Sequence, residues 1–438
     1  MSQDTEKRSL GFWNVWGLVV GGAIGAAVFL LPAILAPYGS LSIVGWLFSA
    51  FAMVAVAMTL GNLARSIPKI GGPYAYAKAA FGDLAGFMIA WSFWVSVWVG
   101  VAAIAVGLTG YLGVFVPIIS DSPAMSAFVA IAFLCILTAI NVAGVKTAAT
   151  LNLVLTILKL LPLFAVGAAG LLLGEVASIP AADSQGEPFM FFFAGLILIT
   201  IGAFVGIEAG TVPADDIIEP EKTIPRALFF GSLTIAAIYI LGTAGVMAVV
   251  STEDLASSAS PFSAAASVIF GSWGAKIIAL GAIISILGVL NVTILLTGQM
   301  PLAAAQDGLF PAHFASVNSH GAPVFGLIVS TVLASLVIGM NYTGGVVAAY
   351  EALFLMTTIA AIVVYAACAA ADLVLQFRAR KAGSKMRWQS MLTAMVAFAI
   401  SIFAIVGSGL EVAVYTALLL VAGLPVFFWS RSTARRTN

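Results

Sequence analysis

The stretch "GLVVGGAIGAAVFLLPAI", residues 17–34, is the first long apolar run of the chain. With its flanks it is long enough for a spanning helix, which needs about 20 mainly apolar residues. The centre of the run, residues 21–27, nevertheless consists of glycine and alanine around one isoleucine, and Pro32 follows. Glycine weakens a helix through its backbone freedom, and proline lacks an N–H donor. The sequence therefore predicts a membrane span that is weakest near its middle.

The composition predicts that lipid surrounds most of the chain. Hydrophobic residues make up 62% of the 438 positions and charged residues only 8%. A soluble protein has about 25% charged residues to cover its surface. The formal net charge of zero argues against nucleic acid as a partner. We expect an all-α integral membrane protein, with the lipid bilayer as its surroundings.

Twelve candidate spans follow one another along the chain as a single transmembrane domain over residues 1–438. Their centres lie near residues 25, 52, 97, 132, 162, 201, 239, 286, 332, 361, 399 and 420. Alternate connections carry lysine and arginine, such as Arg65, Lys222 and Arg378, whereas the others carry mainly carboxylates, such as Asp121 and Glu253. Because basic residues favour the cytoplasmic side, this pattern predicts a multi-pass protein of the cytoplasmic membrane with both termini in the cytoplasm.

The sixth candidate span, "GLILITIGAFVGIEAGTVP" at residues 195–213, also has a weak centre, at Gly202, Gly206 and Gly210. One interpretation is close helix packing, because these glycines form a small-xxx-small series. The other is that spans one and six both break in mid-membrane and expose backbone groups to a solute, as in transporters built from inverted repeats. The spans are the first members of two consecutive groups of five, which fits the second interpretation.

Two ionisable residues lie deep within spans, where a charge is costly. Glu208 lies beside the glycines of the sixth span, and Lys159 lies in "LVLTILKLLPLF" of the fifth. Glu208 could make a structural hydrogen bond to a neighbouring helix, and Lys159 could snorkel along its methylene stem. Alternatively, both could exchange protons, since desolvation disfavours a charged side chain. The second interpretation predicts proton-linked transport.

Four motifs, in this order and spacing, resemble the amino acid–polyamine–organocation superfamily, in its basic amino acid and polyamine antiporter branch. They are "GGAIGAAVFLLP" in the first span, "IGGPYAYAKAAFG" at residues 70–82, "GAFVGIEAGTVPADDIIEPEKTIPRAL" from the sixth span onward, and "TGQMPLAAAQDGLFPAHFASVNSHGAPV" at residues 297–324. The resemblance implies two inverted five-helix repeats, at about residues 11–174 and 189–375, with broken helices 1 and 6. Two extra helices, at about 389–430, contribute to a homodimer in many members of the family.

The resemblance also implies a central substrate site and alternating access. Backbone N–H groups around the first break would bind a substrate carboxylate, at Ala23, Ile24, Gly25, Ala26 and Ala27. Carbonyls from Gly202 to Gly206 would receive its amino group. By the same resemblance Phe204 and Thr293 line the substrate, and Lys159 and Glu208 couple protons. Tyr74 and Phe93 fall at gating positions.

Several positions depart from the arginine/agmatine antiporters of this branch. Gly25-Ala26-Ala27 stands where Gly-Ser-Gly is usual, Gly202 and Thr293 replace two tryptophans, Val101 replaces an asparagine and Phe93 a tyrosine. The main aromatic faces for a guanidinium are therefore missing, and we expect a roomier, more apolar pocket.

We predict a secondary active transporter that exchanges amino acids or their amines, of the arginine/agmatine type by resemblance. A proton-coupled symporter for neutral amino acids is the alternative. The sequence contains no P-loop, nucleophile elbow or metal-ligand cluster, so we expect neither an enzyme nor a cofactor or metal site.

Overall fold

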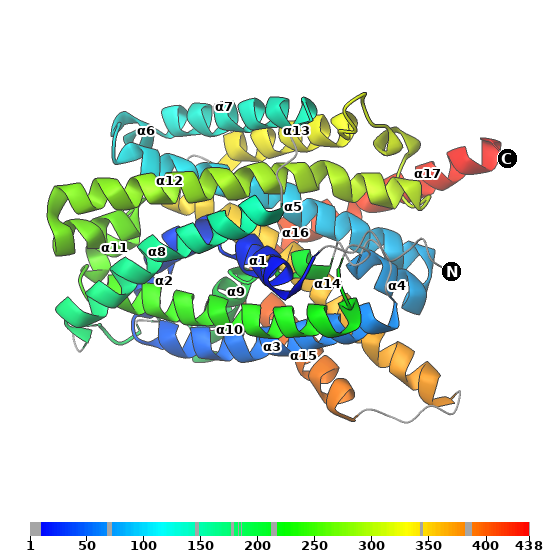
Figure 1. Ribbon diagram of the computed structural model, residues 1–438, viewed down its shortest axis with the longest axis horizontal. Coiled ribbons are helices and arrows are strands. Elements are labelled where there is room, and N and C mark those ends of the chain that lie inside the picture. Colours follow the sequence, from blue (N-terminus) through cyan, green and yellow to red (C-terminus); the bar gives the residue numbers. More distant parts are fainter. Residues whose placement is uncertain are drawn as a thin grey trace.

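The computed structural model describes residues 10–67, 72–144, 149–176, 179–182, 184, 186–211, 217–341, 345–381 and 388–437. Parts of two motifs, residues 70–71 and 212–216, lie outside this range. The helices run roughly along the long axis of one bundle, and both chain ends lie at the same end of it (Figure 1). We call this the termini end and the opposite one the far end.

The first half of the chain forms α1 Phe12–Ala23, α2 Ala26–Leu35, η1 Ala36–Tyr38, α3 Leu41–Ser66, α4 Pro73–Phe81, α5 Asp83–Gly113, α6 Ile118–Asp121, α7 Pro123–Val142 and α8 Ala149–Leu173. The second half forms α9 Phe189–Gly202, η3 Ile207–Thr211, α10 Pro220–Met247, α11 Thr252–Ser257, α12 Pro261–Gln306, η5 Ala312–Ala315, α13 Val324–Asn341, α14 Gly345–Lys381, α15 Trp388–Val406, α16 Leu410–Val421 and α17 Gly423–Thr437. An isolated β-bridge joins Leu10 to Ile217.

Eight described helices are long and apolar enough to cross a membrane, or nine if α1 and α2 count as one bent span. Three shorter apolar helices, 159–173, 189–202 and 324–340, also lie where spans are predicted. These findings support an all-helical, multi-pass membrane protein. The count of twelve spans, the inverted repeats and their boundaries stay predictions.

The outer surface of the bundle is apolar, as a lipid environment requires. Leu172, Trp273, Met340 and Leu410 are each more than three-quarters exposed. In water, so many exposed apolar side chains would be an aggregation hazard. On a membrane protein they are the surface that faces lipid.

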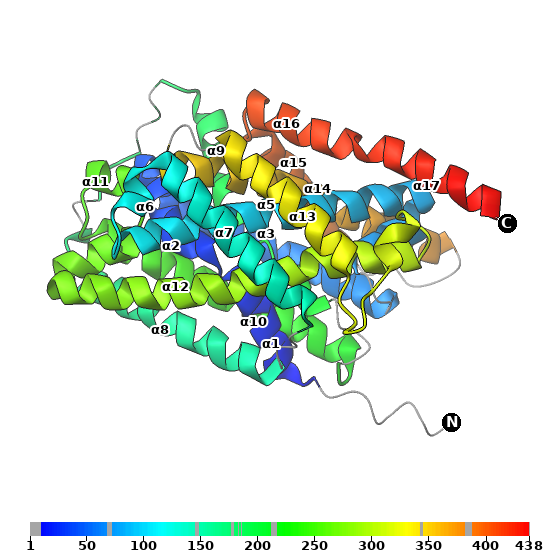
Figure 2. The same cartoon turned by 90° about the horizontal axis from the view of Figure 1, so that it is seen from above.

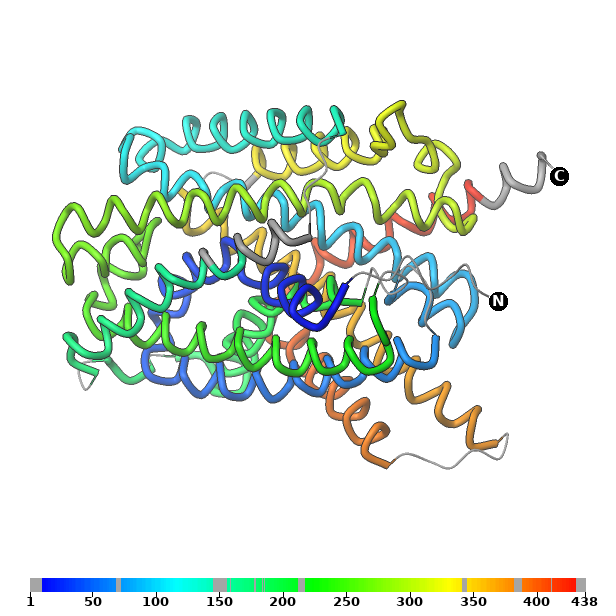
Figure 3. The backbone as a smooth tube through the Cα atoms, in the orientation of Figure 1, coloured from blue at the N-terminus to red at the C-terminus, as the bar shows by residue number. Residues whose placement is uncertain are grey.

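The core forms where the long helices α5 and α14 pack together. Most of α5 is buried, including Ser92, Trp94 and Tyr111. The helices α3 and α10 lie side by side along one edge (Figure 3), and α16 and α17 run along an outer edge (Figure 2). The helix α1 ends next to the start of α2 inside the bundle, and Figure 2 shows that its other end lies at an edge of the bundle.

Candidate functional site

The first span is broken at the predicted place. α1 ends at Ala23, Ile24 and Gly25 have non-helical backbone angles, and α2 starts again at Ala26. The two pieces are bent by 43°. A Cβ on Gly25 would lie 3.1 Å from a methyl of Val289 on α12, so the break also packs closely.

The N-terminus of α2 faces the break and can receive an anion. The first N–H groups of a helix have no partner within it, and the helix dipole makes this end positive. Gly25 has no side chain with which to cap Ala26 and Ala27. Such a terminus favours a negatively charged group such as a carboxylate.

Lys159 binds the other side of the same break. Its ammonium donates to the carbonyl oxygens of Gly21, at 2.7 Å, and Ile24, at 2.6 Å. Lys159 is only 7% exposed. The last carbonyls of a helix lack intrahelical donors and lie at its negative end, where a cation is favourable. The structure therefore supports a buried contact and not snorkelling.

The sixth span is broken too, because α9 ends at Gly202 and a turn leads into η3. Gly206 in this turn has φ 111°, a conformation that side chains disfavour. A Cβ on Gly22 would lie 2.7 Å from the carbonyl oxygen of Gly206, so the two breaks touch through their backbones. The glycines therefore serve close packing as well as the break.

Glu208 closes a hydrogen-bonded loop at the second break. Its Oε2 accepts from the Gly206 N–H at 3.0 Å and from the Tyr365 hydroxyl, on α14, at 2.6 Å. Glu208 is 3% exposed. The structural hydrogen bond to a neighbouring helix, one of the two interpretations of Glu208, is thus present. It joins the second break to α14.

Tyr239 links the two breaks and was not predicted. From α10, its hydroxyl lies 2.9 Å from the carbonyl oxygen of Ala23 and 2.8 Å from that of Ala203. A buried tyrosine usually has a hydrogen-bond partner, so a lone tyrosine in an apolar span was an available signal. Its partners are far away in the sequence and could not be inferred.

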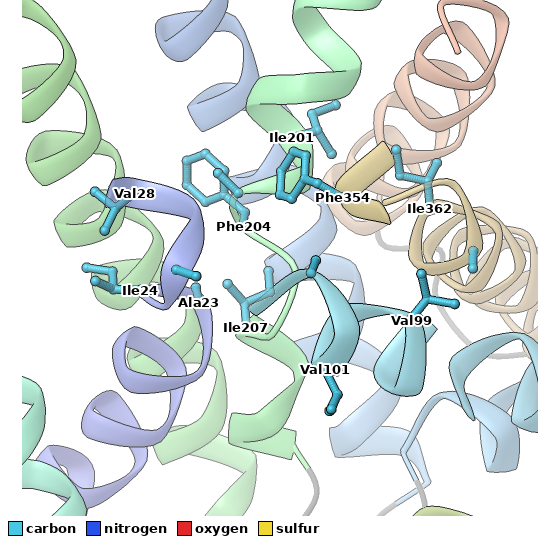
Figure 4. Packing of buried hydrophobic residues seen from close by; sticks show 14 of the residues in the cluster. Ala23, Ile24, Val28, Val99, Val101, Ile201, Phe204, Ile207, Phe354 and Ile362 are labelled. Carbon is cyan, nitrogen blue, oxygen red and sulfur yellow. The ribbon is translucent and has the colours of Figure 1, made fainter. Parts of the chain in front are cut away.

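Phe204 packs against Tyr239 and Trp46, with ring centroids 5.7 and 6.4 Å apart. Figure 4 shows Phe204 with Ile207 on the sixth span, near Ala23 and Ile24 of the first. These residues are all buried. A substrate-lining role for Phe204 stays a prediction.

Two other predicted residues lie on the helices α12 and α5. Thr293 is half-buried on α12 and donates to Val289 O, one turn earlier in the same helix, at 2.8 Å. Phe93 is half-buried on α5, and its carbonyl accepts from the Ser96 hydroxyl at 2.7 Å. Their roles in binding and gating stay predictions.

At Gly202 itself the structure leaves no extra room, and the roomier pocket as a whole stays a prediction. A Cβ there would lie 2.8 Å from Cζ of Phe354 and would overlap Thr358, both on α14. Side chains of another helix already fill the volume that a larger residue at this position would need.

Tyr74, at the start of α4, lies at the termini end. Its hydroxyl donates to Oδ2 of Asp307, just after α12, at 3.0 Å. Burial, together with this hydrogen bond, raises the pKa of Tyr74 well above its ordinary value. The bond joins α4, in the connection between two spans, to the end of α12. A gate requires such a link between elements. The gating role of Tyr74 stays a prediction.

Several bacterial antiporters are similar in sequence to this chain. The amino acid permease family matches residues 10–422. An arginine/ornithine antiporter of Pseudomonas aeruginosa is 29% identical, aligning 98% of this chain and 92% of that protein. A putative arginine/ornithine antiporter of Bacillus subtilis is 30% identical, over 97% of this chain and 96% of that protein. A cadaverine/lysine antiporter of Escherichia coli K12 is 30% identical over 78% of each chain. The chain therefore belongs to the amino acid permease family, within the amino acid–polyamine–organocation superfamily.

Proposed function

We propose that the protein is a secondary active transporter that exchanges cationic amino acids or their amines across the cytoplasmic membrane by alternating access. Family membership supports amino acid transport in general. The names of the relatives support exchange and a cationic substrate, because they are antiporters for arginine and ornithine or for cadaverine and lysine.

The observation that carries this proposal is the meeting of two broken spans. The N-terminus of α2 presents N–H groups, whereas the ends of α1 and α9 present carbonyls. Opposite partial charges therefore lie a short distance apart, which suits the carboxylate and ammonium of an amino acid. We propose that the residues from Ala23 to Ala27 bind the former group and those from Gly202 to Gly206 the latter.

Lys159 and Glu208 are the groups that we propose to change protonation during transport. Each is buried and bonded to a different break. Gain or loss of a proton would alter those bonds and so favour one arrangement of the broken spans over another. With basic connections at the termini end, we propose that this end is cytoplasmic.

The test uses purified protein in liposomes loaded with one unlabelled compound at a time. Entry of labelled arginine into vesicles that contain arginine, ornithine or agmatine, and not into empty vesicles, is the expected result. Uptake of labelled leucine into empty vesicles under an inward proton gradient would instead establish the neutral symporter and overturn the proposal.

A further inference from the structure

The sixth span is buried on the far-end side of its break. All residues from Leu196 to Phe204 are buried, whereas Val205 and Gly206 are half-buried. On the first span Gly22 is exposed although it lies at mid-span, and α2 beyond it is buried except for Ala27. The half-helices α9 and α2, which lead from the two breaks to the far end, are therefore buried where they meet the breaks.

The cover at the far end comes partly from α14, through a tight fit at Gly202. A Cβ on Gly202 would overlap the Thr358 hydroxyl oxygen and would lie 2.8 Å from the ring tip of Phe354 and 2.9 Å from the Thr358 methyl. The Thr358 hydroxyl donates to Phe354 O within its own helix, at 2.7 Å. Its hydrogen bond is thus satisfied locally, and Thr358 meets α9 as a packing surface.

Tyr350 extends this surface towards the first span. Its ring stacks on Phe354, with centroids 5.7 Å apart and planes 15° apart. A Cβ on Gly107 of α5 would lie 3.5 Å from Tyr350 and 3.2 Å from Cβ of Ala26. The aromatic pair therefore extends from the start of α2 to the end of α9, the two half-helices that meet at the candidate site, and Figure 4 shows Phe354 beside the sixth span.

We propose that Phe354 and Thr358 are the closing surface of the far-end gate, and that Gly202 is the notch into which they dock. This inference rests on the proposed alternating access. A solute that enters from the far end can reach the breaks only after α14 separates from Gly202. Because packed interiors do not tolerate added volume, closure requires a residue without a side chain at this position.

The first experiment places a wedge in the notch. Gly202→Ala adds one methyl group at a contact that has no space for it, and we expect exchange to slow about tenfold or more because closure is disfavoured. Gly339→Ala is the matched control, because a Cβ there meets nothing within 4 Å. Gly202→Ala combined with Phe354→Leu and Thr358→Ala should restore exchange.

The second experiment reads the gate without transport. Val205→Cys, in a Cys135→Ser background, is treated with a membrane-impermeant methanethiosulfonate in right-side-out and inverted vesicles. We expect little labelling from the far end in this parent, and a rise of about tenfold with the wedge, because the same packing cost disfavours closure. Phe354→Ala should also raise far-end labelling, because it removes the ring that packs on Gly202. Unlike Gly202→Ala, this change adds no volume.

Two results would overturn the inference. One is normal exchange in Gly202→Ala, and the other is lost exchange with no gain of far-end labelling in either Gly202→Ala or Phe354→Ala. Failure of the unmodified protein to exchange any amine is a separate result, because it would refute the proposed function while the labelling still reports on the gate.

Discussion

Gly22 and Gly206 bring the two broken spans into backbone contact. A Cβ on Gly206 would lie 2.5 Å from the carbonyl oxygen of Gly22, and the φ of 111° at Gly206 adds strain for any side chain. The candidate site is thus built from main chain, at a separation that side chains would not allow.

Gly206→Ala should therefore reduce exchange severely and destabilise the protein by about 1–3 kcal/mol, because both the backbone strain and the contact oppose it. The control is Gly308→Ala, since Gly308 has φ 72° but a Cβ there meets nothing within 4 Å. Thermal unfolding and exchange are measured on both variants. Equal losses in the two would show that conformation alone, and not contact between the breaks, requires glycine.

Lys159→Ala should flatten the pH dependence of flux and lower its rate, because it removes the donor to Gly21 and Ile24. A hydrogen bond from a charged group contributes about 1.5–3 kcal/mol. Exchange is followed at pH values from about 5 to 8, on both sides of neutrality. Lys276→Ala, at an exposed position, is the control. Flux in Lys159→Ala that depends on pH as in the parent would refute the coupling role.

Glu208→Gln should retain an acceptor for the Gly206 N–H and the Tyr365 hydroxyl while removing the exchangeable proton. We therefore expect a folded protein with exchange that no longer responds to pH. Tyr365→Phe removes the second bond, and its effect on stability should be non-additive with Glu208→Gln by about 0.5–3 kcal/mol, because the residues are in contact. Additive effects would contradict the paired role.

Tyr239→Phe should weaken the link between the breaks without creating a cavity. Loss of the hydroxyl, whose single proton is donated to the carbonyl of Ala23 or of Ala203, costs about 1–3 kcal/mol. We expect the KM for exchange to rise, since the Ala203 carbonyl also belongs to the proposed ammonium site. A fall in maximal rate with unchanged KM would assign Tyr239 to helix packing alone.

Tyr74→Phe should loosen the contact at the termini end by about 1.5–3 kcal/mol, the range for a hydrogen bond to a charged group. Because burial raises the pKa of Tyr74 in the folded protein, its neutral form is favoured on folding. Its contribution is complete below the ordinary tyrosine pKa of about 10 and is lost only as the pH rises through the higher folded value. The stability difference between Tyr74→Phe and the parent should thus be constant between about pH 5 and pH 9, as measured by thermal unfolding. A difference that falls within this interval would contradict the assignment.

The sequence by itself determined where the membrane helices are interrupted and where ionisable side chains lie within them. The glycines at 21–25 and 202–210 interrupt two spans, because backbone freedom at mid-membrane is a local property. Lys159 and Glu208 could be singled out for the same kind of reason, since an ionisable side chain in an apolar span is costly wherever it is directed.

Only the tertiary structure decided what these residues touch. The partners of Lys159 lie more than 130 residues away in the chain, as do Ala23 for Tyr239 and Tyr365 for Glu208, and Ala203 lies in the turn after α9. The filling of the notch at Gly202 by Phe354 likewise depends on how α14 packs on α9. Helix packing fixes such contacts through the shapes of whole surfaces, and no local pattern records which distant side chain enters a given space.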